Sequence, residues 1–224
     1  MMNNFKLGIK MLRYGSGLVS MMVCGVAFFV LGLLMNIWDK TLGNAGLSGD
    51  ILMMILVMFP AQIIYSLSVS NLVQSSPAKK RMQTSVPATV TCFCVIALYL
   101  LLSLINGIMI IRHPEYIRAI CVETVTMAMF VVFIMISIAV AYKHFWMSFI
   151  AGFAVYYMIS ARMTIVEKFQ FEIFGSNAGS FALALVIGLI IIVLGGFGQY
   201  GVSLLVYKAP MSKYAQSAAV RKEM

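Results

Sequence analysis

The sequence contains several apolar runs that are close to 20 residues long and almost free of charge. A run of that length, wound as a helix, crosses the roughly 30 Å hydrocarbon core of a bilayer. Backbone groups that face lipid have no water to bond, so each such span has to be helical. Of all residues, 62% are hydrophobic and 10% are charged, whereas soluble domains carry roughly 25% charged residues. The sequence therefore predicts an all-α membrane protein.

Six transmembrane spans are expected, after an amphipathic helix over residues 1–15 and before a polar tail over residues 207–224. The spans cover about residues 16–37, 51–69, 87–111, 119–142, 146–160 and 181–206. Residues 38–50 are expected to form a loop. We expect Pro60 to kink the second span, and Pro87 suits the first position of the third. The first apolar run is longer than the core of a typical signal peptide, so we expect it to stay uncleaved.

The distribution of Lys and Arg predicts the orientation of the chain. A cytoplasmic N-terminus places eleven of the 16 Lys and Arg residues on the inner side, as the positive-inside rule requires. The C-terminus is then cytoplasmic as well. The net charge of +9 gathers at the inner face, where anionic lipid supplies the counter-charge. A nucleic-acid partner is not needed to explain it.

The N-terminal segment carries Lys6, Lys10 and Arg13 at i, i+4 and i+7, which form one basic stripe on a helix. This pattern predicts an interfacial helix whose cations face lipid headgroups. The alternative is an ordinary positive flank of the first span.

The connector between the second and third spans predicts a short basic helix. Ser76 and Pro77 are typical of an N-cap and a first helical residue. The candidate docking element comprises Ser76, Pro77, Lys79, Lys80, Arg81, Met82, Gln83 and Thr84. The alternative is that Lys79, Lys80 and Arg81 only fix the topology.

The outer segment 162–179 is too apolar for a free loop and too charged for a span. It is expected to be a re-entrant or interfacial hairpin, with a plain amphipathic loop as the alternative.

Polar side chains at membrane depth are candidates for a transport path or for contacts between helices. They include Gln62, Asn106, Glu123 and Gln199. Glu123 is the ionisable member, and such residues are costly to bury. We expect it to form a structural ion pair with Arg118 or Arg162, and we expect the amides to join helices.

No catalytic residue, metal site or disulfide is expected in this chain. The sequence has no phosphate-binding loop and no H-E-x-x-H motif. Its two histidines, His113 and His144, fall on opposite sides of the predicted membrane, which argues against an intramembrane protease. The four cysteines lie in or beside apolar segments, where thiols behave as small hydrophobes.

In the order of its parts the chain resembles the six-span membrane subunits of ABC exporters of the type V fold. The matching parts are an elbow helix at Phe5 to Tyr14, a coupling helix at Pro77 to Thr84, and outer re-entrant helices at about 162–179. The resemblance implies a bacterial plasma-membrane protein that dimerises with a second membrane subunit. It also implies two ABC-type ATPase subunits that hold ATP and Mg, with no cofactor bound by this chain. The small outer loops resemble those of exporters of peptides or lipid-like molecules.

A different class of function is also consistent with the sequence. A six-helix substrate-capture protein would bind a small vitamin-like molecule and pass it to an import machine. It would be a monomer with a polar outer pocket.

Overall fold

The computed structural model describes residues 2–14, 18–41, 48–56, 58–68, 71–141, 143–144, 174 and 178–208. Within these ranges every regular element is a helix, which confirms the predicted all-α class. In chain order the elements are α1 (Met2–Tyr14), α2 (Leu18–Thr41), α3 (Ser48–Ile55), α4 (Met58–Ser68), α5 (Asn71–Gln74), α6 (Lys79–Gln83), α7 (Ser85–Arg112), the 3₁₀ turn η1 (Pro114–Tyr116), α8 (Ile117–Ala141) and α10 (Ala178–Lys208).

Three helical segments of the described chain are long and apolar enough to cross a membrane, namely Lys79–Arg112, Pro114–Ala141 and Gly179–Lys208. Two shorter apolar stretches, Val23–Trp38 and Leu52–Tyr65, lie where the first two spans are predicted. The predicted span 146–160 lies outside the described residues. So do most of the outer segment 162–179 and residues 209–224 of the predicted tail.

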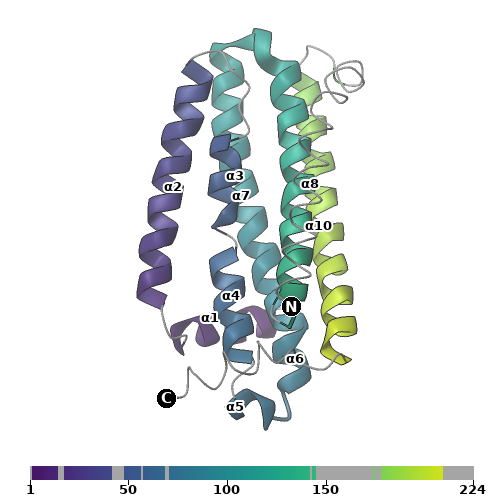
Figure 1. Ribbon diagram of the computed structural model, residues 1–224. Coiled ribbons are helices and arrows are strands. Elements are labelled where there is room, and N and C mark those ends of the chain that lie inside the picture. Colours follow the sequence, from purple (N-terminus) through teal and green to yellow (C-terminus); the bar gives the residue numbers. More distant parts are fainter. Residues whose placement is uncertain are drawn as a thin grey trace.

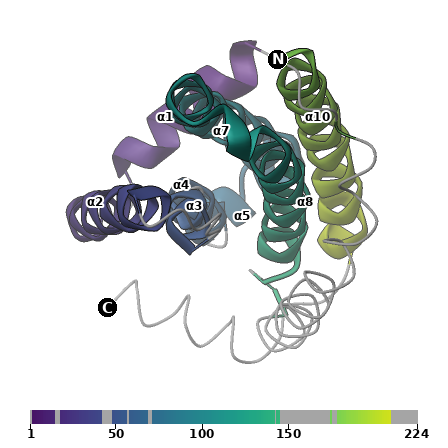
Figure 2. The ribbon, with the colours of Figure 1, turned by 90° about the horizontal axis from the view of Figure 1, so that it is seen from above.

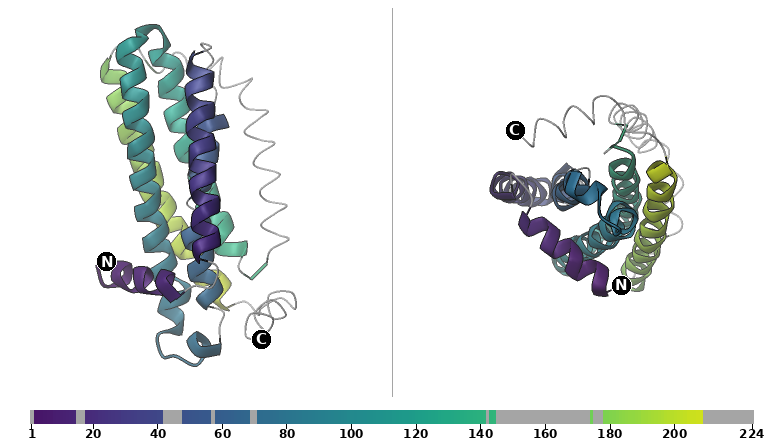
Figure 3. Two further views of the ribbon diagram at one scale, coloured as in Figure 1. Left: turned by 90° about the vertical axis from the view of Figure 1, so that its left-hand side faces the viewer. Right: turned by 90° about the horizontal axis from the view of Figure 1, so that it is seen from below.

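The long helices form a bundle, and α1 lies across one end of it (Figures 1 and 3). Helices α8 and α10 run side by side in the same direction, with α7 against both (Figure 2). Helix α2 packs mainly on α3, at the other side of the bundle. The main core cluster lies between α3, α7, α8 and α10 and includes Met53, Tyr99, Met127, Met135 and Ile192. Its methionines fit the irregular space between helices, because the unbranched thioether adapts its shape.

Glycines let α10 approach its neighbours closely. A Cβ atom on Gly195 would overlap the side chain of Val132 on α8. A Cβ atom on Gly188 would overlap the ring of Tyr99 on α7. Small residues at such positions are typical of helix contacts in membranes, where packing replaces the hydrophobic effect as the driving force.

The predicted second span is interrupted. Helix α3 ends at Ile55, the backbone turns at Leu56, and α4 starts at Met58. Pro60 explains the break, because it lacks an N–H and its ring clashes with the carbonyl four residues earlier. Since Pro60 falls in the first turn of α4, its missing donor leaves no helical bond unmade there.

Two predicted boundaries are wrong. Residues 38–50 are not all loop, because α2 extends to Thr41 and α3 starts at Ser48. Helix α7 starts at Ser85 and not at Pro87, which occupies the third helical position. A proline is tolerated there for the same reason as at the first position, since the first N–H groups of a helix have no partner within it.

Candidate functional site

Helix α1 is fixed to the bundle by its apolar face. Met11 is buried in a cluster with Ile64 of α4 and with Val86 and Val90 of α7. Gly8 brings the α1 backbone against Val90, since a Cβ atom there would overlap that side chain. Lys6 and Lys10 are exposed, so the predicted basic stripe and the packed face are separated on this helix. The side chain of Arg13 lies outside the described residues.

Helix α6 lies at the same end of the bundle as α1, between α4, α5, α7 and α10 (Figure 1). Lys80 and Arg81 are exposed, whereas Gln83 and the following residue Thr84 are buried. The helix therefore has one basic face toward solvent and one face packed into the bundle. Thr84 joins it to α7, and its hydroxyl donates to the carbonyl of Lys80.

The predicted start of this helix is wrong by two residues. Ser76 is not its N-cap and Pro77 is not its first residue, because α6 begins at Lys79 and has no side-chain cap. The hydroxyl of Ser76 instead accepts the backbone N–H of Ala78. That local bond stabilises a turn and competes with helix formation.

A side-chain hydrogen bond joins α1 to α6. The Nε of Arg81 donates to the Oδ1 of Asn4. Met82 also packs against the cluster that holds Met11. The interfacial helix and the basic helix are thus connected directly, a relation that spacing along the chain does not reveal.

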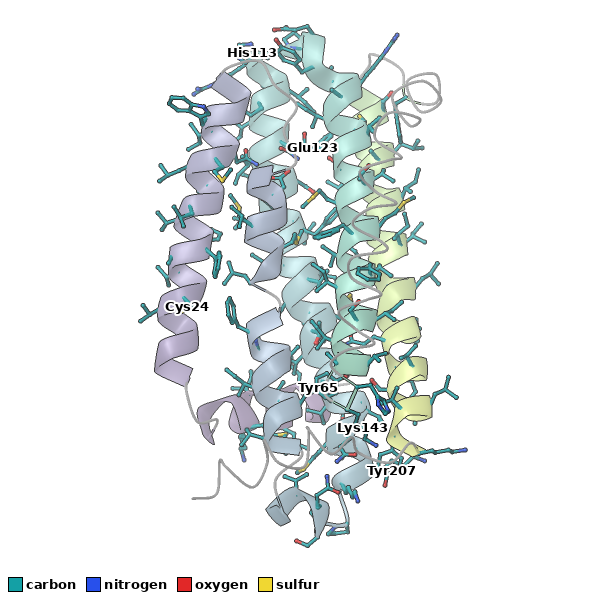
Figure 4. All side chains as sticks on the ribbon, viewed as in Figure 1. Cys24, Tyr65, His113, Glu123, Lys143 and Tyr207 are labelled. Carbon is teal, nitrogen blue, oxygen red and sulfur yellow. The ribbon has the colours of Figure 1, made fainter. Side chains whose placement is uncertain are left out.

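Lys143 follows α8 and closes the same end of the bundle (Figure 4). It is 4% exposed, and its Nζ donates to the carbonyls of Val206 and Tyr207 at 2.8 and 2.9 Å. These carbonyls belong to the last turn of α10, where the helix dipole favours a cation. Burial, and after it the charge of Lys79, lower the pKa of Lys143 below its ordinary value.

A polar layer lies toward the other end of the bundle, near Glu123 in Figure 4. Met54, Leu102 and Met127 belong to one core cluster. Three buried polar residues, Asp50, Asn106 and Glu123, each lie four residues from one of these in sequence. They are therefore one helical turn closer to the end of the bundle that holds His113.

Asn36 of α2 completes this layer by donating its amide Nδ2 to Asp50. Gly32 and Gly49 make the contact possible, because each lies against the backbone of the other helix. Arg118, one predicted partner of Glu123, is exposed, while Glu123 is buried. The other, Arg162, lies outside the described residues.

A second polar group joins three helices nearer to α6. The hydroxyls of Tyr65 on α4 and Ser203 on α10 form a hydrogen bond of 3.0 Å. Gln199 of α10 donates to Thr91 of α7 at 3.5 Å. Of the predicted interhelical amides, Gln199 therefore joins helices, and the side chain of Gln62 lies outside the described residues.

Sequence reasoning missed Asn36, Asp50, Tyr65 and Lys143. A signal for Asp50 existed, because Ser48 and Asp50 suit the first turn of a helix. Tyr65 and Lys143 acquire their roles from partners far along the chain, Ser203 and Val206. Among the described residues no group of three His, Cys, Asp or Glu side chains is placed to hold a metal ion.

Comparison with protein-family models, with curated proteins and with solved structures found no match to this chain.

Proposed function

We propose that this chain is a membrane subunit of an ATP-driven exporter, with α6 as the helix on which a separate ATPase acts. The observation that carries the proposal is the two-sided character of α6. Its exposed Lys80 and Arg81 suit an acidic partner surface, while its buried Gln83 and Thr84 lead directly into α7. A push on α6 is therefore delivered to a helix long enough to cross the membrane.

The proposed role of α6 also determines the orientation of the chain in the membrane. An ATPase that uses cellular ATP has to lie in the cytoplasm, so the end with α1 and α6 is the cytoplasmic end. The chain then belongs in a bacterial plasma membrane with Lys6 and Lys10 near anionic headgroups. ATP and Mg are held by the partner, and a second membrane subunit completes the path. The cargo is a peptide or a lipid-like molecule, in line with the small predicted outer loops.

Copurification from native membranes tests the proposal. We expect the tagged chain to retain a subunit that carries a phosphate-binding loop. Charge reversal of Lys79, Lys80 and Arg81 to Glu should abolish this retention, because the contact depends on charge complementarity. The matched control reverses Lys6 and Lys10, which are exposed at the same end. Absence of an ATPase from the wild-type complex, or equal retention by the triple variant, would refute the proposal.

The polar layer of Asn36, Asp50 and Glu123 favours one other function, the capture of a small molecule for an import machine. Buried polar side chains toward the far end of the bundle would suit a ligand that enters from outside. Native mass spectrometry separates the two functions. The exporter predicts a dimer with ATPase subunits, whereas the capture protein predicts a monomer with a bound small molecule.

A further inference from the structure

We infer that Lys143 is a positioning residue that fixes the end of α10 to α8 and makes this helix pair respond to the position of α6. The inference rests on the proposed function only in identifying α6 as the helix that is displaced. The attachment of α10 to α8 by Lys143 does not depend on the proposed function.

The geometry of Lys143 differs from that of an ordinary loop lysine. The chain leaves α8 at Ala141, and the backbone N–H groups of Lys143 and His144 both bond to the carbonyl of Val140. This turn directs the Lys143 side chain toward α10. Two of the three ammonium donors are used on the last turn of α10, at Val206 and Tyr207. The ring of Tyr207 adds a cation–π contact at 5.7 Å.

Through these contacts one side chain at the end of α8 also caps the end of α10. The last four carbonyls of a helix have no partner within it and require donors from elsewhere. Lys143 supplies two such donors from the end of α8. The terminal turns of α8 and α10 are therefore held together, in addition to the glycine contacts along their length.

Helix α6 interacts with Lys143 through the charge of Lys79. Burial is the larger cause of the lowered pKa of Lys143, and the like charge of Lys79, the first residue of α6, lowers this pKa further. Helix α6 also contacts α10 directly. Like charges repel less as they separate, so a displacement of α6 away from the bundle favours the ammonium form of Lys143 that bonds to α10. A displacement toward the bundle disfavours that form. A displacement of α6 thus affects the α8–α10 pair through Lys143, in addition to its effect on α7 through Thr84.

Amide hydrogen exchange on the purified full-length chain in lipid nanodiscs tests this inference without an ATPase. Lys143→Met keeps an unbranched side chain but removes the donors and the charge. We expect exchange in the last turn of α10 to become roughly tenfold faster, as for loss of a partly buried cation at a helix end. Lys143→Arg should restore most of the protection. The matched control is Lys208→Met, an exposed lysine of the same turn, which should change exchange by less than about twofold.

The link to α6 is tested by charge reversal. Lys79→Glu turns repulsion into attraction and should slow exchange in the last turn of α10 by about two- to threefold. The same change in the Lys143→Met background should have no effect. The inference is overturned by unchanged exchange in Lys143→Met, or by an equal effect of Lys79→Glu in both backgrounds. Failure of an ATPase to copurify would refute the proposed function and leave these exchange results standing.

Discussion

Helices α8 and α10 are continuous over their whole length, whereas the arm formed by α3 and α4 is interrupted beside Leu56. The pair is held by shape, because Gly195 lets the backbone of α10 lie against Val132. The arm packs into the main core through Met53 and Met54, and side-chain hydrogen bonds hold it near its two ends. Asp50 bonds to Asn36 at one end, and Tyr65 bonds to Ser203 at the other.

This difference assigns different mechanical roles to the two regions. A continuous pair in close contact moves as one unit, since separating it would lose packing along its whole length. A broken helix absorbs bending at the break, where the regular backbone bonds are already missing. We therefore expect α8–α10 to be the rigid part of the bundle and Leu56 to be the hinge.

The largest effect is expected from removal of the close approach in the rigid pair. Gly195→Leu should lower the free energy of unfolding by about 3 kcal/mol or more, because the new side chain overlaps Val132. Gly201→Leu is the control, since nothing lies within 4 Å of a Cβ atom at that position. Denaturant unfolding in detergent micelles measures both. Equal stability of the two variants would show that the pair is not held by shape.

The next effect concerns the hinge. Pro60→Ala restores a backbone N–H and removes the ring that clashes with the preceding turn. We expect amide exchange in residues 54–59 to slow by on the order of tenfold, with little change in global stability. Pro87→Ala, in the first turn of the uninterrupted α7, should leave local exchange unchanged. If exchange around Leu56 does not respond to Pro60→Ala, the proline is not the cause of the break.

A smaller effect is expected where the arm meets the pair. A double-mutant cycle of Tyr65→Phe and Ser203→Ala should give a coupling energy of about 0.6–1.7 kcal/mol, the range of hydrogen bonds between membrane helices. Thermal unfolding of the two single variants and the double variant supplies the cycle. A coupling near zero would mean that the 3.0 Å contact does not stabilise the arm.

The smallest effect is the pH dependence of the end of the rigid pair. Burial, then the charge of Lys79, lower the pKa of Lys143 below 10.5, so the unfolded chain binds this proton more tightly than the folded one. The free energy of unfolding should therefore rise as the pH increases from the folded-state pKa toward 10.5. The neutral amine keeps two N–H donors for Val206 and Tyr207. Lys143→Met should remove this rise, and a fall over the same pH range would contradict the assignment.

The apolar runs alone predicted where α7, α8 and α10 lie, because few structures other than helices satisfy a backbone in lipid. The basic periodicity at Lys6 and Lys10 likewise predicted α1. The residue pattern Ser76–Pro77 predicted the wrong start for α6, because the Ser76 hydroxyl stabilises a turn and does not cap the helix.

Contacts between distant segments were beyond prediction from one sequence. The sequence places Asn36 near the end of the first span and Asp50 in a loop, and their contact forms only because α2 and α3 approach each other through Gly32 and Gly49. In the sequence, Lys143 is one of the positive charges that predict orientation. Its bonds to the last carbonyls of α10 appear only when α10 packs against the end of α8. In both cases the role depends on helix packing, which hydropathy does not encode.

Photo-crosslinking in intact cells tests directly whether α6 is the element that contacts an ATPase, with a photoreactive residue at Lys80 on α6 or at His113 at the other end of the bundle. We expect an adduct at position 80 with a soluble subunit that carries a phosphate-binding loop, and no such adduct at position 113. An adduct with that subunit at position 113, or labelling of position 80 by a reagent that cannot enter the cell, would contradict the proposed role of α6.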